Sequence, residues 1–384
     1  MRVVELLKEV TIMNTILVVQ MNIFMLILLL CVAVHACFRL NRKKQEHRLF
    51  LTLIFFETFI LTLEIASVAL NASQYADFII IHKLTDTLGF FLTPTLPIIA
   101  ALYAYERANK NKRIPINKFP WLKAPFIING FLSLGSYYFN WIFTITNENL
   151  YVRGPLFFVS PVTSYFYYVV HLLVLYYNRN KISKEELVGL SCLTLVPAIF
   201  SIIQLYYYIY LTIWNSIAIA VVINYIFIMH NEAQYDPLTG VGNRIAYDEY
   251  LAALSGKSNV AFSVVNIDMD DFKSINDIYG HQEGDNVLKL FARYLEEVFD
   301  GKGVVIRLGG DEFIVLLHDK SKNMAEQCIA NLKNMINKYN VTGDARYCIQ
   351  FSYGIAVYDN SFHNINEFIR HSDKLMYEEK QKKK

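Results

Sequence analysis

Cysteine is scarce in this chain, and its few copies are not arranged for a metal or redox site. Five cysteines occur in 384 residues, and no two of them form a Cys-x-x-Cys pair. The spacing gives no support for a disulfide framework or a zinc site. We interpret all five as small buried hydrophobic residues. They are Cys31, Cys37, Cys192, Cys328 and Cys348.

Acidic residues are rare in the first 230 residues, and this difference in composition divides the sequence into two parts. Residues 1–230 are apolar and aromatic with very few acids, whereas residues 236–384 have the composition of an ordinary soluble domain. The net charge of +2 and the hydrophobic content of 54% average over these two parts. The length suits two domains. We therefore expect a membrane region at 1–230, a short junction at 231–235 and a globular domain at 236–384.

Long apolar runs fill the first part. A membrane-spanning helix needs about 20 mostly apolar residues, and seven segments are candidates. The first is long enough to span and shows no small-residue cleavage motif, so we expect a span rather than a cleavable signal peptide. The seven predicted spans are 14–38, 49–71, 84–105, 124–145, 156–177, 187–206 and 210–229.

Basic side chains are concentrated in alternate connectors between these spans. The first, third and fifth connectors are rich in Lys and Arg, while the others carry little beyond Lys83 and Arg153. Basic loops tend to stay on the cytoplasmic side of a membrane. The alternation therefore predicts seven spans, with the N-terminus outside and the residues from 230 onward in the cytoplasm. The basic residues are Arg39, Arg42, Lys43, Lys44, Arg48, Arg107, Lys110, Lys112, Arg113, Lys118, Arg179, Lys181 and Lys184.

Titratable side chains fall inside the predicted spans, where their burial costs free energy. Glu57 and Glu64 lie close to two helical turns apart, on one face of the second span. His82 and Asp86 lie near the outer end of the third span, and His171 lies in the fifth. These residues indicate either a ligand or proton pocket in the outer half of the bundle, or ordinary hydrogen bonds between helices.

Two connecting segments are short. The outer segment 147–155 is expected to be a turn, with a lid as the alternative. No heptad repeat follows the seventh span, so no long coiled coil separates the membrane from the second part. Asp236, Pro237 and Gly240 mark a turn there. A signal would therefore pass almost directly from the last span into the globular domain.

The second part alternates strands and helices, with acids where strands end. The run 261–267 is rich in β-branched residues and predicts a strand that ends at Asp268. The Gly-Gly-Asp-Glu segment at 309–312 lies between two apolar runs and predicts a hairpin turn. Glycines let the backbone approach a ligand, and adjacent carboxylates suit a Mg²⁺ ion bound to a phosphorylated substrate. We expect these acids to meet in space.

The remaining elements complete a mixed fold. The patterns predict helices at 322–339 and 364–380 and a strand at 347–358. The order is β-α-α-β-β-α-β-α. It predicts an α+β domain near the ferredoxin-like plan, with antiparallel strands and helices on one face. Such a domain resembles those of the nucleotidyl cyclases. The fold class is therefore an all-α membrane bundle of about seven helices followed by this α+β domain.

Five motifs in order resemble those of the GGDEF-domain diguanylate cyclases, a family named after the pentapeptide at 309–313. The resemblance covers residues 236–384. The first part resembles, in architecture alone, the seven-helix sensor regions that precede bacterial signalling domains. The motifs are 236–244, 268–285, 307–313, 352–356 and 373–380.

The resemblance implies a Mg²⁺ site, with Mn²⁺ as an alternative. Asp268 and Asp311 would bind the ion through their carboxylates, and Met269 through its carbonyl. Glu312 would bind metal or help to deprotonate the attacking 3′-hydroxyl. Asp311, Glu312 and Gly310 would form the catalytic turn.

The resemblance also implies a GTP site. Asn276 and Asp285 would read the guanine edge, since a carboxylate accepts hydrogen bonds from the guanine N1–H and amino groups, a pair of donors that adenine lacks. Gly309, with Gly310, would admit the nucleotide. The implied phosphate-binding positions are Phe272 and Lys273, through backbone N–H groups, and Lys380 and Lys384, through their side chains.

The implied reaction condenses two GTP molecules into cyclic di-GMP and releases two pyrophosphates. Each domain holds one GTP, so a homodimer is required. The chain would be a multi-pass protein of the bacterial cytoplasmic (inner) membrane, with GTP, lipid and an unidentified sensory ligand as partners and no nucleic acid. One family feature is missing, because the Arg-x-x-Asp motif of product inhibition is replaced by Asp300 and Gly303.

Other functions stay open. A catalytically silent GTP-binding module is the main alternative, and the complete set of acids argues against it. A transporter with a regulatory domain is disfavoured by sparse intramembrane charge and by the lack of a visible repeat of broken helices. A mixed GMP–AMP product is disfavoured by Asp285.

Overall fold

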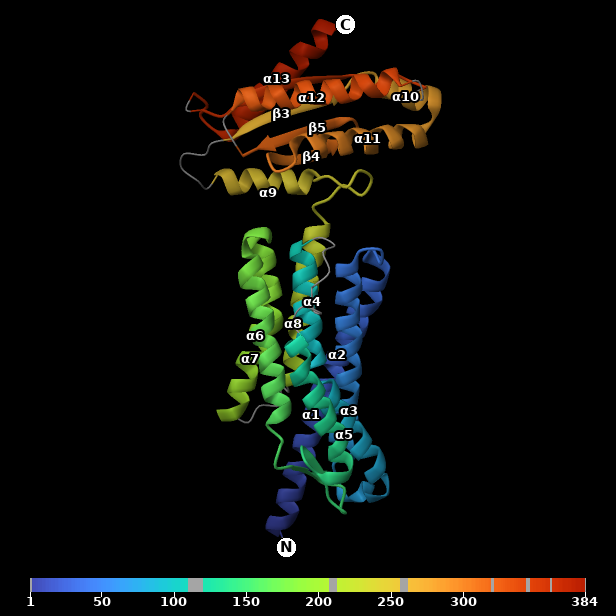
Figure 1. The fold of residues 1–384 in the computed structure, drawn as a ribbon, viewed down its shortest axis with the longest axis vertical. Coiled ribbons are helices and arrows are strands. Elements are labelled where there is room, and N and C mark those ends of the chain that lie inside the picture. Colours follow the sequence, from blue (N-terminus) through green and yellow to red (C-terminus); the bar gives the residue numbers. More distant parts are fainter. Residues whose placement is uncertain are drawn as a thin grey trace. The chain divides into compact units, whose positions relative to one another are not determined.

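The chain divides into two compact units in a computed structural model (Figure 1). The first is Met1–Ile228 and the second is Met229–Lys384. Each unit is described by itself. The structure describes residues 2–109, 120–206, 213–255, 262–318, 321–342, 346–359 and 361–383.

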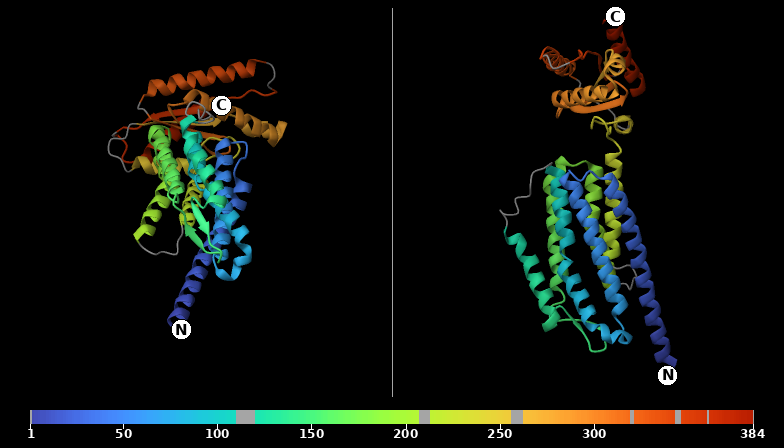
Figure 2. Two further views of the ribbon diagram at one scale, coloured as in Figure 1. Left: turned by 60° about the horizontal axis from the view of Figure 1, so that its bottom comes forward. Right: turned by 90° about the vertical axis from the view of Figure 1, so that its right-hand side faces the viewer.

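The first unit is a bundle of helices that run side by side (Figures 1 and 2). Its apolar sequence favours helices because a helix satisfies its own backbone hydrogen bonds. The α-helices are α1 (Arg2–Arg39), α2 (Gln45–Leu70), α3 (Ile79–Leu92), α4 (Thr95–Asn109), α5 (Ala124–Phe139), α6 (Val159–Asn178), α7 (Lys184–Tyr206) and α8 (Ile213–Glu232). Short 3₁₀ helices are η1 (Ser73–Phe78), η3 (Pro120–Lys123) and η4 (Arg179–Lys181).

Five helical stretches in the described part of the chain are long and apolar enough to cross a membrane. The prediction of seven spans is therefore not reproduced. The clearest difference is the predicted span 124–145, since α5 has 16 residues and ends at Phe139. At a rise of 1.5 Å per residue it is about 24 Å long, short of the roughly 30 Å of a bilayer core. The five stretches are Val19–Arg39, Gln45–Leu70, Ser73–Asn109, Val159–Lys181 and Ile213–Glu232.

A β-hairpin follows α5 instead of a continued helix. Strands β1 (Phe143–Ile145) and β2 (Tyr151–Arg153) pair antiparallel, so the expected outer turn at 147–155 comprises the loop and second strand of a hairpin. Ile142, Phe143 and Ile145 are buried against α3 and α5. The hairpin lies at the end of the bundle that holds the N-terminus (Figure 1).

The second unit contains a four-stranded sheet and five helices among its described residues. The sheet order is β4-β5-β3-β6, and every neighbouring pair is antiparallel. The α+β class is confirmed, with the order expected of a ferredoxin-like plan. The elements are α9 (Arg244–Ser255), β3 (Ser263–Met269), α10 (Phe272–Tyr279), α11 (His281–Phe299), β4 (Gly303–Gly309), β5 (Glu312–Leu317), α12 (Lys322–Val341), β6 (Phe351–Val357) and α13 (Ile365–Lys383).

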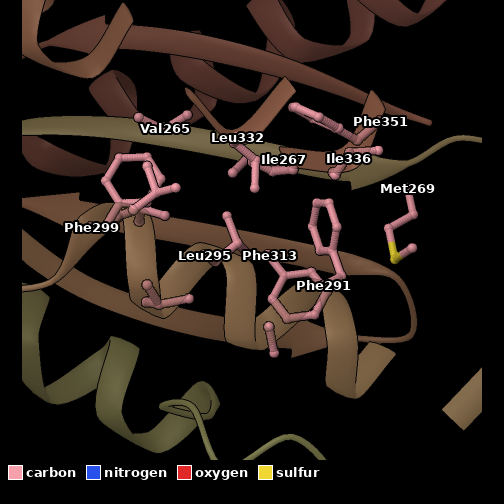
Figure 3. Close-up of a cluster of buried hydrophobic side chains, with 14 of the residues drawn as sticks. Val265, Ile267, Met269, Phe291, Leu295, Phe299, Phe313, Leu332, Ile336 and Phe351 are labelled. Carbon is pink, nitrogen blue, oxygen red and sulfur yellow. The ribbon is translucent and has the colours of Figure 1, made fainter. Parts of the chain in front are cut away.

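Helices cover both faces of this sheet, so the prediction of helices on one face was wrong. On one face, Val265 and Ile267 of β3 pack with Phe291 of α11 and Leu332 of α12 (Figure 3). On the other face, Val264 packs in a cluster with residues of α9 and α13. The reason is visible in β3, since all of its positions are buried. A strand whose side chains are buried on both faces needs cover on both sides.

The cysteines are free, in agreement with the absence of a disulfide framework. The prediction that all five are buried is correct only for Cys328. Cys31 and Cys348 are exposed, and Cys37 and Cys192 are half-buried. The hydrophobic character of cysteine therefore did not determine whether each of these side chains is buried.

Candidate active site

The acids of the two predicted motifs meet at one end of the central strands. Asp268 lies near the end of β3 and pairs in register with Glu312 at the start of β5. Directly opposed side chains in an antiparallel pair have Cβ atoms roughly 4.5–5.5 Å apart. The Met269 N–H donates to the carbonyl oxygen of Asp311 at 3.3 Å, which ties the turn to β3.

The glycine turn is open to ligands. Gly310 has φ of 52°, which favours glycine, and the ladder between β4 and β5 is irregular at Gly309. No heavy atom lies within 4 Å of a Cβ built at either position. A ligand can therefore approach the backbone closely at this turn.

Arg307 holds the turn from one side, and no role was predicted for this residue. Its guanidinium donates from Nε and Nη2 to the Gly310 carbonyl, at 3.0 and 2.7 Å, and from Nη1 to Asp236 Oδ1 at 3.0 Å. Asp236 also accepts from the N–H of Thr239 at 2.8 Å. Burial opposes ionisation of Asp236, but the hydrogen bonds from Thr239 and Arg307 outweigh it and lower its pKa. The opening Asp-Pro-Leu-Thr-Gly segment is thereby linked to the turn.

Helix α13 brings basic side chains to the acids. The Nζ of Lys380 donates to Asp268 Oδ1. One turn later, Lys383 Nζ lies 3.2 Å from Asp270 Oδ2 and 3.1 Å from Ser352 Oγ, and Ser352 donates to Asp270 at 2.7 Å. The end of α13 is thus fixed to β3 and β6 by charge-assisted hydrogen bonds, which are stronger than neutral ones.

The carboxylates repel one another. Burial and then the charge of Asp268 raise the pKa of Asp311. Burial, Asp268 and Asp311 raise the pKa of Glu312 in the same way. Burial would lower the pKa of Lys380, but the hydrogen bond and charge of Asp268 raise it overall. The cluster holds more negative charge than Lys380 can balance.

The donor set suits a hard divalent cation, although the site is not closed around one. No group of three His, Cys, Asp or Glu side chains among the described residues is gathered as a metal site. Asp268 is instead paired with Lys380. Carboxylate and carbonyl oxygens are the ligands that Mg²⁺ prefers, and an added cation would relieve the repulsion between the acids. The residues present therefore fit the ion in chemistry.

The predicted guanine-reading residues lie on two neighbouring helices, Asn276 on α10 and Asp285 on α11. Asn276 of α10 abuts the start of α11, because a Cβ added at Gly284 would lie 2.0 Å from Asn276 Oδ1. Asp285 is the next residue along α11. Phe272 and Lys273 begin α10, where backbone N–H groups have no helical acceptor. Lys384 lies outside the described residues.

A cavity of about 530 Å³ opens beside the acids. Asp268, Glu312 and Lys380 line it together with one face of α13. No role was predicted for Arg370 or Lys374 on that face, although their helical spacing with Tyr377 and Lys380 is visible in the sequence. The full lining is Asp268, Glu312, Arg370, Asp373, Lys374, Met376, Tyr377, Lys380 and Gln381.

Comparison with known proteins agrees with this architecture. Residues 233–384 match the family described as "Diguanylate cyclase, GGDEF domain". An uncharacterized membrane protein of Staphylococcus aureus (strain USA300) is 32% identical over 130 residues, covering 33% of this chain and 36% of that protein. The chain thus spans about a third of the length of the curated relatives that it matches.

Solved structures also match part of this chain. The coiled coil and GGDEF domain of DgcB from Caulobacter crescentus in complex with c-di-GMP is 21% identical, covers 41% of this chain and 85% of that chain, and has a TM-score of 0.38. The GGDEF domain of TpbB (YfiN) from Pseudomonas aeruginosa is 28% identical, covers 38% and 89%, and has a TM-score of 0.35. By its own topology, the second unit is an α+β domain. More narrowly, residues 233–384 are a GGDEF domain.

Proposed function

We propose that this protein is a membrane-bound diguanylate cyclase that converts two GTP molecules into cyclic di-GMP and two pyrophosphates. One observation carries the proposal. Asp268 faces Glu312 across β3 and β5, beside an open Gly-Gly turn that holds Asp311. The family match of residues 233–384 supports the same activity.

The chemistry follows from the positions of these side chains. The 3′-oxygen of one GTP forms a bond to the α-phosphorus of the other, and the bond from that phosphorus to the bridging oxygen breaks to release pyrophosphate. The hydroxyl proton passes to Glu312, whose raised pKa suits it as a base. Asp268, Asp311, Glu312 and the Met269 carbonyl would hold Mg²⁺, which supplies charge stabilisation and a lowered hydroxyl pKa when bound.

Substrate recognition would use groups around the acids. Asn276 and Asp285 would read the guanine edge, and Gly309 and Gly310 would admit the nucleotide. The phosphates would lie near the N–H groups that begin α10, at Phe272 and Lys273, with Lys380 and Lys384 as side-chain donors. Lys380 would then exchange Asp268 for a phosphate oxygen, while the metal takes over the carboxylate.

Assembly and location complete the proposal. One domain binds one GTP, so catalysis requires a homodimer with two sites face to face. The five apolar helices support insertion in a bacterial cytoplasmic membrane, and the basic connectors support a cytoplasmic catalytic domain. A stimulus at the helical unit would gate the enzyme. Because Asp300 and Gly303 replace the Arg-x-x-Asp motif, we expect no feedback inhibition through that site.

The direct test is cyclic dinucleotide output from the full-length protein in membranes with GTP and Mg²⁺. The control is the Asp311→Ala/Glu312→Ala double variant, which should lose at least about 10²-fold of the activity, since it removes pre-organised charge at the reacting centre. Product from the wild type and none from the control supports the cyclase. Equal output from both overturns the assignment of these acids.

A silent GTP-binding module is the second candidate. The Lys380 ion pair favours it, because this lysine neutralises the carboxylate that a metal would need. The two candidates differ in a binding experiment. A dimeric, folded protein that binds GTP but yields no product, with Mg²⁺ or Mn²⁺, would support the module.

A further inference from the structure

A buried pair of side chains lies in the helical unit, away from the GGDEF domain's acids in sequence. His82 and Asp86 of α3 are 0% and 6% exposed. The distance from His82 Nε2 to Asp86 Oδ2 is 3.7 Å, and neither atom has a hydrogen-bond partner. That distance is too long for a hydrogen bond. Two buried polar atoms therefore face each other unsatisfied, which is costly in a low-dielectric interior.

The hairpin fixes the tautomer of His82. Asn149 donates from Nδ2 to the carbonyl oxygens of Leu70 at 2.7 Å and Tyr75 at 2.9 Å, so its Oδ1 is left as an acceptor. His82 Nδ1 lies 2.9 Å from that Oδ1 and must be the donor. A neutral imidazole has one N–H. The Nε2 atom that faces Asp86 is therefore an acceptor opposite an acceptor.

We propose that His82 and Asp86 form a buried proton-binding site. One added proton turns the acceptor pair into an N–H···O bond between imidazolium and carboxylate, and draws the two atoms from 3.7 Å toward the ~2.8 Å of a charge-assisted bond. Free histidine titrates near neutrality, which sets the pH range of the test below.

The surrounding charges favour the protonated pair. Glu64 of α2 interacts electrostatically with Asp86, and Ser67 of the same helix lies beside Asp86. The nearby basic side chains lie over aromatic rings. Lys83 Nζ is 5.9 Å from the centroid of the Tyr137 ring, and Arg153 Cζ is 4.6 Å from the centroid of the Phe157 ring. Titratable and charged groups on α3 itself and on the elements packed against it include Glu57, Glu64, Tyr75, Asp77, Lys83, Tyr137 and Tyr138. Tyr151 of β2 also interacts electrostatically with Asp86.

The site is connected to the helix that leads out of this unit. The side chain of Glu64 lies within interaction distance of Trp214 in the first turn of α8. Helix α8 continues without a break from Ile213 to Glu232, beyond Ile228 where the first unit ends. A change of charge at Asp86 would therefore alter the electrostatic potential at Glu64 and at the first turn of α8. That it would alter cyclase output rests on the proposed function, but proton binding does not.

Tryptophan fluorescence tests the site without using enzyme activity. The chain has three tryptophans, so Trp121→Phe/Trp141→Phe leaves Trp214 as the only reporter. The full-length protein in lipid nanodiscs is titrated from pH 8 to pH 5, and one transition in Trp214 emission is expected. His82→Gln and Asp86→Asn should each abolish it. His171→Gln is the matched control, because His171 is also buried and bonds to Thr194 at 2.6 Å.

The outcomes separate cleanly. A wild-type transition that disappears in Asp86→Asn, which keeps the shape of the side chain, supports the proton site even where His82→Gln fails to fold. No wild-type transition, or one that persists in Asp86→Asn with native helicity, overturns it. Cyclic di-GMP output at the same pH values then reports on coupling alone, so an inactive enzyme would contradict the proposed function and leave the fluorescence result intact.

Discussion

The two units differ in their buried charged groups, although Asn266 and Ser372 of the GGDEF domain also keep a buried atom without a hydrogen bond. In the GGDEF domain, Asp268 is paired with Lys380, and Asp270 shares Ser352 with Lys383. In the helical unit, Glu57, His82, Asp86, Glu106 and His171 each keep a buried atom without a hydrogen bond. A saturated network holds a geometry, whereas an unsatisfied one changes when a proton or ligand arrives. The contrast assigns fixed positioning to one unit and responsiveness to the other.

The largest effect is expected where the GGDEF domain is most tightly packed. At Gly354 of β6, an added Cβ would lie 2.4 Å from the Met376 N and 2.6 Å from the Ser372 O. Gly354→Ala should therefore push α13 from the sheet and cost about 1–3 kcal/mol. Calorimetric unfolding of the full chain in nanodiscs should show the domain transition at lower temperature.

Gly309→Ala is the matched control for that substitution. Its Cβ would meet no heavy atom within 4 Å, so the unfolding transition should stay in place while GTP binding weakens. A fall in stability as large as that of Gly354→Ala would mean that the turn is packed rather than open to a ligand.

A smaller effect concerns the link between Asp236 and Arg307. The lowered pKa of Asp236 means that its charge stabilises the fold above its unfolded pKa of about 3.9 and ceases to do so as the pH falls through the lower folded value. Asp236→Asn should cost about 1 kcal/mol at pH 7. Denaturant unfolding of both proteins should show the difference narrowing below about pH 4, and a constant difference would exclude ionisation as its cause.

The smallest effect is expected in the helical unit. Glu57 is fully buried and neither carboxyl oxygen has a hydrogen-bond partner. Glu57→Gln removes an uncompensated acid, so thermal stability in detergent should rise or change by less than about 1 kcal/mol. Glu46→Gln should lower it, because Glu46 pairs with Arg107 at 2.9 Å. If Glu57→Gln were the more damaging of the two, the comparison between the units would fail.

Local features of the GGDEF domain were predictable from the sequence. The strand before Asp268 and the turn at 309–312 follow from residue types that act within a few positions. The α+β class followed from the order of these elements. Contacts between distant residues were not predictable in this way, and Lys380 with Asp268 joins positions 112 residues apart. The role of Arg307 was missed for the same reason, since its partner Asp236 belongs to another segment.

The helical unit was harder to predict. Apolar runs do not distinguish a helix from a buried strand by hydropathy alone, so Phe143–Ile145 was counted into a span although it forms β1. Asn140 is the informative residue there, because it takes the left-handed conformation that ends α5, with φ of 54°. The contact of Asn149 with His82 depends on that hairpin, and so could not be anticipated from the predicted span.

Helix α8 behaves mechanically as a single rod. It has 20 residues with no proline or glycine among them, about 30 Å in length at 1.5 Å per residue. A continuous helix of this kind transmits rotation and axial displacement from one end to the other, whereas a flexible linker would transmit neither. Each residue advances the helix by about 100°, so inserting one residue would turn everything beyond it by more than a quarter circle, and inserting seven would nearly restore the original direction.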